Sequence, residues 1–223
     1  MKPSCILVAL AAAVAAVVSG AAAADPAITK VMGSIAVPAG QHAGDVSTVN
    51  GSISIGANAV VAKVDTVNGS VTLASHATAD SLETVNGSIK LGEGARVAGQ
   101  VTTVNGALGI ADGADVGAAL SNVNGSIRIG AAHVGGSIET TNSDVTIGPN
   151  AHIDGGIHMN PDTSWWHFFF SGSLPRVVIG AGSVVRGPLN FERAVKLYVS
   201  DHASIGAVTG ATVMRFSGAS PPD

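Results

Sequence analysis

The stretch TVNGSISIG, Thr48 to Gly56, recurs along the chain and decides the fold. Close copies read TVNGSVTLA at 66–74, TVNGSIKLG at 84–92, TVNGALGIA at 103–111 and NVNGSIRIG at 122–130. The five Asn-Gly pairs begin at intervals of 18, 18, 19 and 19 residues, and weaker copies begin at Met32 and Asn142. Self-similarity at a fixed period of this length indicates a repeat architecture.

Two shorter periods lie inside each repeat. Apolar residues recur about every six positions, so three such steps make one repeat, as at Val49, Ile55, Val61, Val67 and Leu73. Apolar and polar residues alternate locally, as in Ile53-Ser54-Ile55, which is typical of a strand with one buried face. Gly, Asn and β-branched residues dominate and no 3.6-residue period is present, which argues against helix.

Short strands separated by Gly or Asn-Gly corners predict a chain wound into a coil whose turns stack about 4.8 Å apart. The predicted fold is all-β: a single-stranded, three-sided β-helix (solenoid) of about nine coils of 18–19 residues, with one aromatic loop insertion. We expect coils at 25–159, the insertion at 160–176, the final coils at 177–216 and a disordered tail at 217–223. Six-residue spacing suits a left-handed coil, but the hand of the coil stays open.

Stacked coils align equal positions of the repeat. We expect Val67, Val71 and Leu73 to point into the shaft, and Thr66 and Thr72 to point outward with the corner asparagines. Stacked corner amides can hydrogen-bond along the axis, which predicts a structural ladder of Asn50, Asn68, Asn86, Asn105 and Asn124. Asn-Gly also tolerates left-handed backbone angles at a corner. The aligned outward row of Thr48, Thr66, Thr84 and Thr103 raises an alternative, a flat array that binds ice or another crystalline surface.

The N-terminus has the layout of a secretory signal peptide at 1–24. Lys2 precedes the apolar run 6–18, and Ala22-Ala23-Ala24 precedes Asp25. The run is shorter than the ~20 residues that a membrane-spanning helix needs. We therefore expect a periplasmic or secreted mature chain that starts near Asp25, without the single cysteine, Cys5.

Charge argues against a nucleic-acid partner. Removing Lys2 from the 11 basic residues leaves 10 against 15 acidic ones, a formal charge of −5. No basic run is present to attract phosphate backbones.

The stretch SWWHFFF at 164–170 interrupts the repeat. It holds five of the eight aromatic residues of the chain. An insertion between coils must project from the shaft or fold along its side, and five large rings in six positions cannot all turn inward. The sequence predicts an interaction loop for protein, membrane interface or glycan, formed by Trp165, Trp166, His167, Phe168, Phe169 and Phe170. Covering one face of the shaft is the alternative.

Several phrases resemble known repeat families. LGEGARVAGQV at 91–101, IGPNAHIDGGI at 147–157 and IGAGSVVRGPL at 179–189 resemble the repeats of the bactofilins and of the hexapeptide-repeat acyltransferases. TVNGSV at 66–71 is similar to repeats of bacterial adhesin domains. Bactofilins are scaffolds that polymerise end to end without nucleotide, so this resemblance implies self-association. It also suits a right-handed coil, against the left-handed one that the six-residue spacing suits. The apparent signal peptide departs from the bactofilin pattern, and the resemblance supports fold more than function.

Seven histidines are candidates for chemistry: His42, His76, His133, His152, His158, His167 and His202. None has a Ser, Cys or carboxylate beside it in a catalytic pattern. His133 and His152 are 19 residues apart and should stack on adjacent coils. Such a pair suits a transition metal, with Asp154 or Asp115 as third ligand, although a solvated surface pair is the simpler interpretation. The Gly- and Asp-rich nonapeptide of calcium-binding β-rolls is absent from the sequence.

These patterns favour a non-catalytic, exported structural or adhesin-like module that acts through its surface and its aromatic loop. A self-polymerising, bactofilin-like scaffold is the first alternative, and an acyltransferase-like enzyme is the second. We expect no cofactor or metal. Expected partners are a second copy stacked end to end and a cell-envelope protein, membrane interface or glycan.

Overall fold

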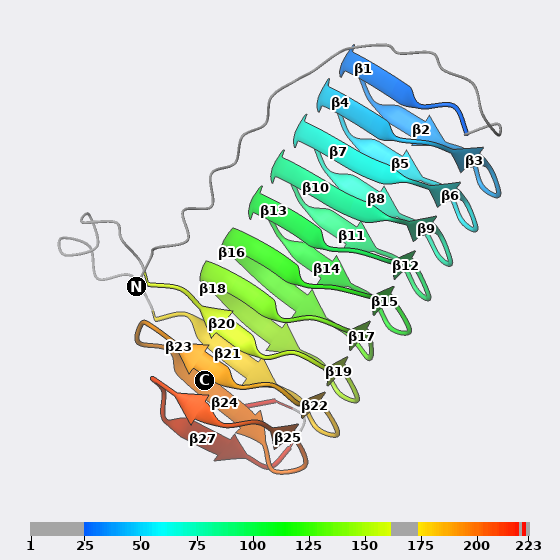
Figure 1. Ribbon diagram of the computed structural model, residues 1–223. Helices are drawn as coiled ribbons and strands as arrows, with labels where there is room; N and C mark the ends of the chain where they lie inside the picture. Colours follow the sequence, from blue (N-terminus) through cyan, green and yellow to red (C-terminus); the bar gives the residue numbers. More distant parts are fainter. Residues whose placement is uncertain (1–24, 162–173, 219, 222–223) are drawn as a thin grey trace.

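The computed structural model describes residues 25–161, 174–218 and 220–221. All regular secondary structure in these ranges is strand, and the strands stack in parallel as a solenoid of about ten turns (Figure 1). The all-β solenoid predicted from the repeat is confirmed, with a turn count close to the expected nine. No helix in the described ranges is long and apolar enough to span a membrane.

Each turn contributes strands to three faces of the shaft. The first face comprises β1 (Ile28–Met32), β4 (Val46–Asn50), β7 (Lys63–Asn68), β10 (Ser81–Asn86), β13 (Val101–Asn105), β20 (Ile157–Met159), β23 (Leu189–Phe191) and β26 (Val208–Thr209). The second comprises β2 (Ile35–Val37), β5 (Ile53–Ile55), β8 (Val71–Leu73), β11 (Ile89–Leu91), β14 (Leu108–Ile110), β21 (Arg176–Ile179), β24 (Lys196–Ser200) and β27 (Val213–Phe216). Two longer strands, β16 (Leu120–Ile129) and β18 (Ile138–Ile147), continue from the first face into the second.

The third face is a nine-stranded sheet of two-residue strands. These are β3 (His42–Ala43), β6 (Val60–Val61), β9 (Thr78–Ala79), β12 (Arg96–Val97), β15 (Asp115–Val116), β17 (His133–Val134), β19 (His152–Ile153), β22 (Val184–Val185) and β25 (Ser204–Ile205). Such short strands gain their stability from the strands above and below them, because each turn buries its apolar side only by stacking.

The register between turns aligns equal positions of the repeat. Asn86 of β10 lies beside Asn68 of β7 and beside Asn105 of β13. The inward residues of all three faces form one continuous core; Val64, Val71, Leu73 and Ile89 are fully buried in it. Alternation along most strands, as in the buried-exposed-buried pattern of β8, places every second residue on the outside.

The predicted orientation of the first face is wrong by one residue. Thr66 and Thr84 are 3% and 0% exposed and point into the shaft, whereas Val67 and Val85 lie partly exposed on the outside. Because side chains alternate with a period of two, a shift of one residue reverses the whole strand. The true inward pair on this face is Val64 and Thr66, so the threonine row is not an outward array and the ice-binding alternative fails.

The inward threonines are stable because their hydroxyl groups are satisfied. Thr48, Thr66, Thr84 and Thr103 each donate a hydrogen bond to the carbonyl oxygen of the corner glycine in the preceding turn, over 3.0 to 3.2 Å. Asn122 replaces threonine in the next turn, and its amide donates to Gly106 O at 2.7 Å. A buried hydroxyl is tolerated only with such a partner, and the sequence pattern alone does not reveal the partner.

Several corner glycines have a different role from the one predicted. Gly69 does not have a left-handed φ; a Cβ at this position would lie 1.9 Å from Gly51 O of the preceding turn. Glycine is therefore required by the close approach of two backbones. Positive φ occurs in the same corner row at Gly33 and Gly125, with 100° and 143°. It also occurs at the other corner, after the second face, where Asn58 and His76 have φ of 57° and 58°.

Candidate interaction surfaces

The corner between the first and second faces carries a ladder of side-chain amides. Asn68 Nδ2 donates to Asn50 Oδ1 over 2.9 Å, and the same bond links Asn86 to Asn68, Asn105 to Asn86 and Asn124 to Asn105 over 3.0 to 3.1 Å. Asn142 extends the row by one step at 3.2 Å. The asparagines from Asn50 to Asn124 are exposed, and Asn142 is half-buried. Their bonds stabilise the corner, and their amide groups are not nucleophiles, acids or bases.

Arg193 meets the C-terminal end of this ladder. Its Nη1 hydrogen-bonds Asn142 Oδ1 and donates to Thr141 O at 3.0 Å. The guanidinium thus supplies a donor to the last amide oxygen, in the place that a further asparagine would take. The repeat pattern did not identify this residue, because Arg193 lies outside the copies of the motif.

The aromatic stretch interrupts this same corner. β20 stacks on the first part of β18 through Ile157 and Ile138, and β21 stacks on the second part through Val177 and Val145. Met159 and Arg176 are therefore the ends of the two strands between which other turns have an Asn-Gly corner. The predicted interaction residues Trp165, Trp166, His167, Phe168, Phe169 and Phe170 lie outside the described residues, as does the predicted signal peptide at 1–24.

Arg176, the first residue of β21, contacts two other residues of the shaft. Arg176 N donates to Asp144 Oδ1 over 2.8 Å, and the Arg176 guanidinium lies 4.9 Å from the centroid of the Tyr198 ring. A cation over an aromatic face at this distance is attractive. The root of the insertion is thus held beside β24, on the second face.

His133 bridges two carboxylates on the third face. Its Nδ1 lies 2.6 Å from Asp115 Oδ1 and its Nε2 lies 2.9 Å from Asp154 Oδ2; Arg186 also contacts Asp154. These hydrogen bonds, to Asp154 first and then to Asp115, raise the pKa of His133 above its usual value. The hydrogen bond from His133, with the charge of Arg186, lowers the pKa of Asp154.

The predicted pairing of His133 with His152 exists as a register pair of β17 and β19. Both ring nitrogens of His133 are engaged by carboxylates, so a metal ion would have to displace a hydrogen bond. Within the described ranges, no group of three or more His, Cys, Asp or Glu residues is placed to hold a metal ion. The arrangement is an ion-pair bridge between three turns of the shaft.

Comparisons with protein families, with curated proteins and with solved structures find no match. The resemblance to bactofilin and adhesin repeats therefore stays a prediction from the sequence.

Proposed function

We propose that this protein is a non-catalytic, exported structural module: a stiff shaft that presents an insertion from one corner and acts through its surfaces. The observation that carries the proposal is the register around the insertion. β18 pairs with β20, which precedes the insertion, and with β21, which follows the insertion. The strands then continue in parallel through β24 and β27. A stack that continues on both sides of an inserted segment is suited to display that segment.

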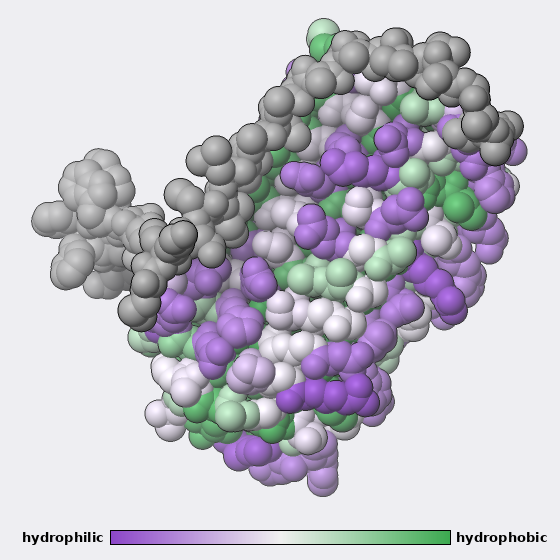
Figure 2. Space-filling view, viewed as in Figure 1, coloured by the Kyte–Doolittle hydropathy of each residue, from purple (hydrophilic) through white to green (hydrophobic). Residues whose placement is uncertain are grey.

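The outer surface supports binding by contact rather than turnover. The outward side chains are largely small or polar, and Figure 2 shows hydrophilic residues over much of one side with smaller apolar areas between them. One described hollow is a shallow groove of about 610 Å³ with mixed charges, lined by His76, Thr78, Glu93, Gly94, Arg96, Asp112 and Gly113.

Variation of the aromatic residues tests this proposal. The full chain is expressed with its N-terminal segment, and Trp165→Ala with Trp166→Ala is compared with the wild type. We expect an unchanged β-sheet circular dichroism spectrum and melting temperature, together with loss of binding to cell-envelope fractions. A large fall in melting temperature with envelope binding intact would assign the rings to covering the shaft and would contradict the proposal.

End-to-end self-assembly is a second candidate function, favoured by the two ends of the described shaft. β1 pairs only with β4, and β27 pairs only with β24, so each end presents strand edges without a described neighbour. Val31 and Met32 in β1 are 64% and 78% exposed, and Met214 in β27 is 38% exposed. Unpaired edges are templates for another strand, and a head-to-tail contact that does not close into a ring gives a filament.

Lysine at the exposed end tests this second function. Val31→Lys with Met32→Lys places two charges at the edge of the first turn without entering the core. If the ends stack, size-exclusion chromatography with light scattering and electron microscopy will show filaments for the wild type and monomers for the variant. A wild type that remains monomeric at high concentration would exclude stacking and leave the display function untouched.

A further inference from the structure

One turn of the second face departs from its neighbours in the side chains that it presents outward. The central outward residue of the strand is Ser54, Thr72, Lys90, Arg128 and Thr146 in five of the turns, but Gly109 in β14. The corner position is serine at 52, 70, 88 and 126, but Ala107 in the same turn. The sequence TVNGALGIA thus has alanine and glycine at two outward positions that carry larger or polar side chains in the turns on either side.

The backbone does not require glycine at position 109. Its φ is not left-handed, and the nearest atom to a Cβ built there would be Lys90 Cγ at 3.9 Å, an ordinary van der Waals distance. Gly106, in the same turn, would place a Cβ 2.0 Å from Gly87 O. A strand glycine costs about 0.5–1 kcal/mol relative to alanine, and glycine in a strand often marks the close approach of a ligand.

The missing side chains leave a shallow notch of about 530 Å³. Ala107, Gly109 and Ala111 belong to its lining and give it a flat, apolar floor. Lys90 and Arg128 lie on the strands directly to either side of Gly109. Two strand spacings of ~4.8 Å place these two residues about 9.6 Å apart along the shaft.

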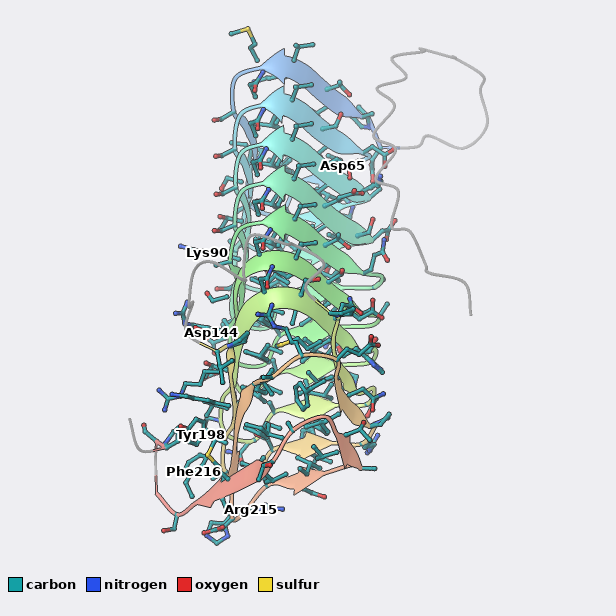
Figure 3. All side chains as sticks on the ribbon, turned by 90° about the vertical axis from the view of Figure 1, so that its left-hand side faces the viewer. Asp65, Lys90, Asp144, Tyr198, Arg215 and Phe216 are labelled. Atoms are coloured by element: carbon teal, nitrogen blue, oxygen red, sulfur yellow. The ribbon has the colours of Figure 1, made fainter. Side chains whose placement is uncertain are left out.

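Both cations are exposed and stand at the rim of the notch. Lys90 projects outward from the shaft (Figure 3) and has no hydrogen-bond or ion-pair partner among the described residues. Arg128 Nη1 donates to Ser126 Oγ over 2.9 Å, a contact with the serine of its own turn. Among the described residues, its charge has no carboxylate partner. Asp112, near the other end of the lining, is engaged with Ala131 N over 2.8 Å.

We propose that this notch binds an acidic saccharide chain, with the apolar face of one sugar ring on Gly109 and the alanines. Carboxylates of the chain pair with Lys90 on one side and with Arg128 on the other. An open floor without outward polar side chains suits the C–H face of a ring, and two cations two turns apart suit an anion whose charges repeat along a polymer. A charge-assisted hydrogen bond to each carboxylate provides the specificity. Binding here needs neither the aromatic insertion nor stacking of the ends.

The experiment uses the full chain and a tetramer of galacturonic acid as the probe, with the neutral tetramer maltotetraose as control, measured by isothermal titration calorimetry. We expect binding of the acidic tetramer that weakens as salt is added, and no binding of maltotetraose. Gly109→Thr fills the notch with the residue type that Thr72 and Thr146 supply in other turns. It should weaken binding at least about tenfold without lowering the melting temperature. Lys90→Gln with Arg128→Gln should weaken binding by a similar factor.

Ser54→Thr, on the same face away from the notch, is the matched control and should bind like the wild type. The proposal is overturned if the acidic tetramer does not bind, if maltotetraose binds equally, or if Gly109→Thr retains full affinity. Equally tight binding of tetraglutamate would assign the notch to an acidic peptide instead, and complete competition by equimolar inorganic phosphate would assign it to a single small anion. Either result would contradict the saccharide assignment.

Discussion

The Thr84 hydroxyl donates a hydrogen bond to the carbonyl oxygen of Gly69 over 3.0 Å, from a side chain that is 0% exposed. The bond joins the inside of one turn to the corner of the turn before it. Because the same bond recurs at Thr48, Thr66 and Thr103, the buried polar row fixes the Asn-Gly corners along the shaft.

Removal of this hydroxyl should destabilise the shaft. Thr84→Val keeps the shape of the side chain but leaves Gly69 O without its donor, and an unsatisfied buried acceptor costs about 1–3 kcal/mol. Val85→Thr, on the outside of the same strand, should change the free energy of unfolding by no more than about 0.5 kcal/mol. Urea unfolding followed by circular dichroism measures both variants; an equal loss in the two would show that the inward and outward assignments are wrong.

Two glycines that lie two turns apart should respond in opposite ways to alanine. Gly69→Ala would place a methyl group 1.9 Å from Gly51 O, so the backbones must separate, and such overpacking costs about 1–3 kcal/mol. Gly109→Ala meets no close atom and should be neutral or stabilising by up to about 1 kcal/mol. Melting temperatures of the two variants decide the point. A fall of equal size at both positions would mean that Gly109 has a structural role.

The repeat period carried enough information to predict the architecture, because strands, Gly corners and a fixed spacing of 18–19 residues leave few other ways to bury the Val and Ile residues. The sequence did not predict which residues of the first face point into the shaft. Thr66 and Val67 both suit strands, and only the carbonyl of Gly51 shows which of the two belongs inside. The notch at Gly109 was visible as a break in the repeat, but its meaning depends on Lys90 and Arg128 of adjacent turns, which the register brings together.

A carboxylate in the asparagine ladder should destabilise it in a pH-dependent manner. Asn86→Asp removes the donor to Asn68 Oδ1 and places oxygen against oxygen, whereas the protonated acid donates again. With an ordinary Asp pKa near ~3.9, the loss, about 1 kcal/mol for an exposed bond, should appear as pH rises through that value. Thermal melts at pH 3 and pH 7 measure it, and Asn86→Ala serves as the pH-independent control. A loss that is the same at both pH values would argue against the ladder bond.

The bridge at His133 should make the stability of the shaft depend on pH in a defined direction. Hydrogen bonds to Asp154 and Asp115 raise the pKa of His133 in the folded protein above 6.5, its ordinary value. The stabilisation is therefore fully present below pH 6.5 and is lost as pH rises through the folded pKa of His133. Asp154 acts in the opposite sense: its pKa is lowered below 3.8, so its contribution is present above pH 3.8 and is lost as pH falls through the folded value. His133 faces Asp115 and Asp154, with Arg186 on Asp154 and His152 beside it in register.

Titration of the His133 ring protons by NMR, with melting temperatures over the same range, measures this dependence. Asp154→Asn should lower the pKa of His133, because it removes the charge of the carboxylate that contributes most. It should also flatten the fall in melting temperature between neutral and mildly alkaline pH. His152→Gln is the matched control, since it changes the register neighbour without touching either carboxylate bond, and it should leave the pKa of His133 raised. If His133 titrates at or below 6.5 in the wild type, the two carboxylates do not hold its proton, and the bridge between the three turns contributes nothing to folding.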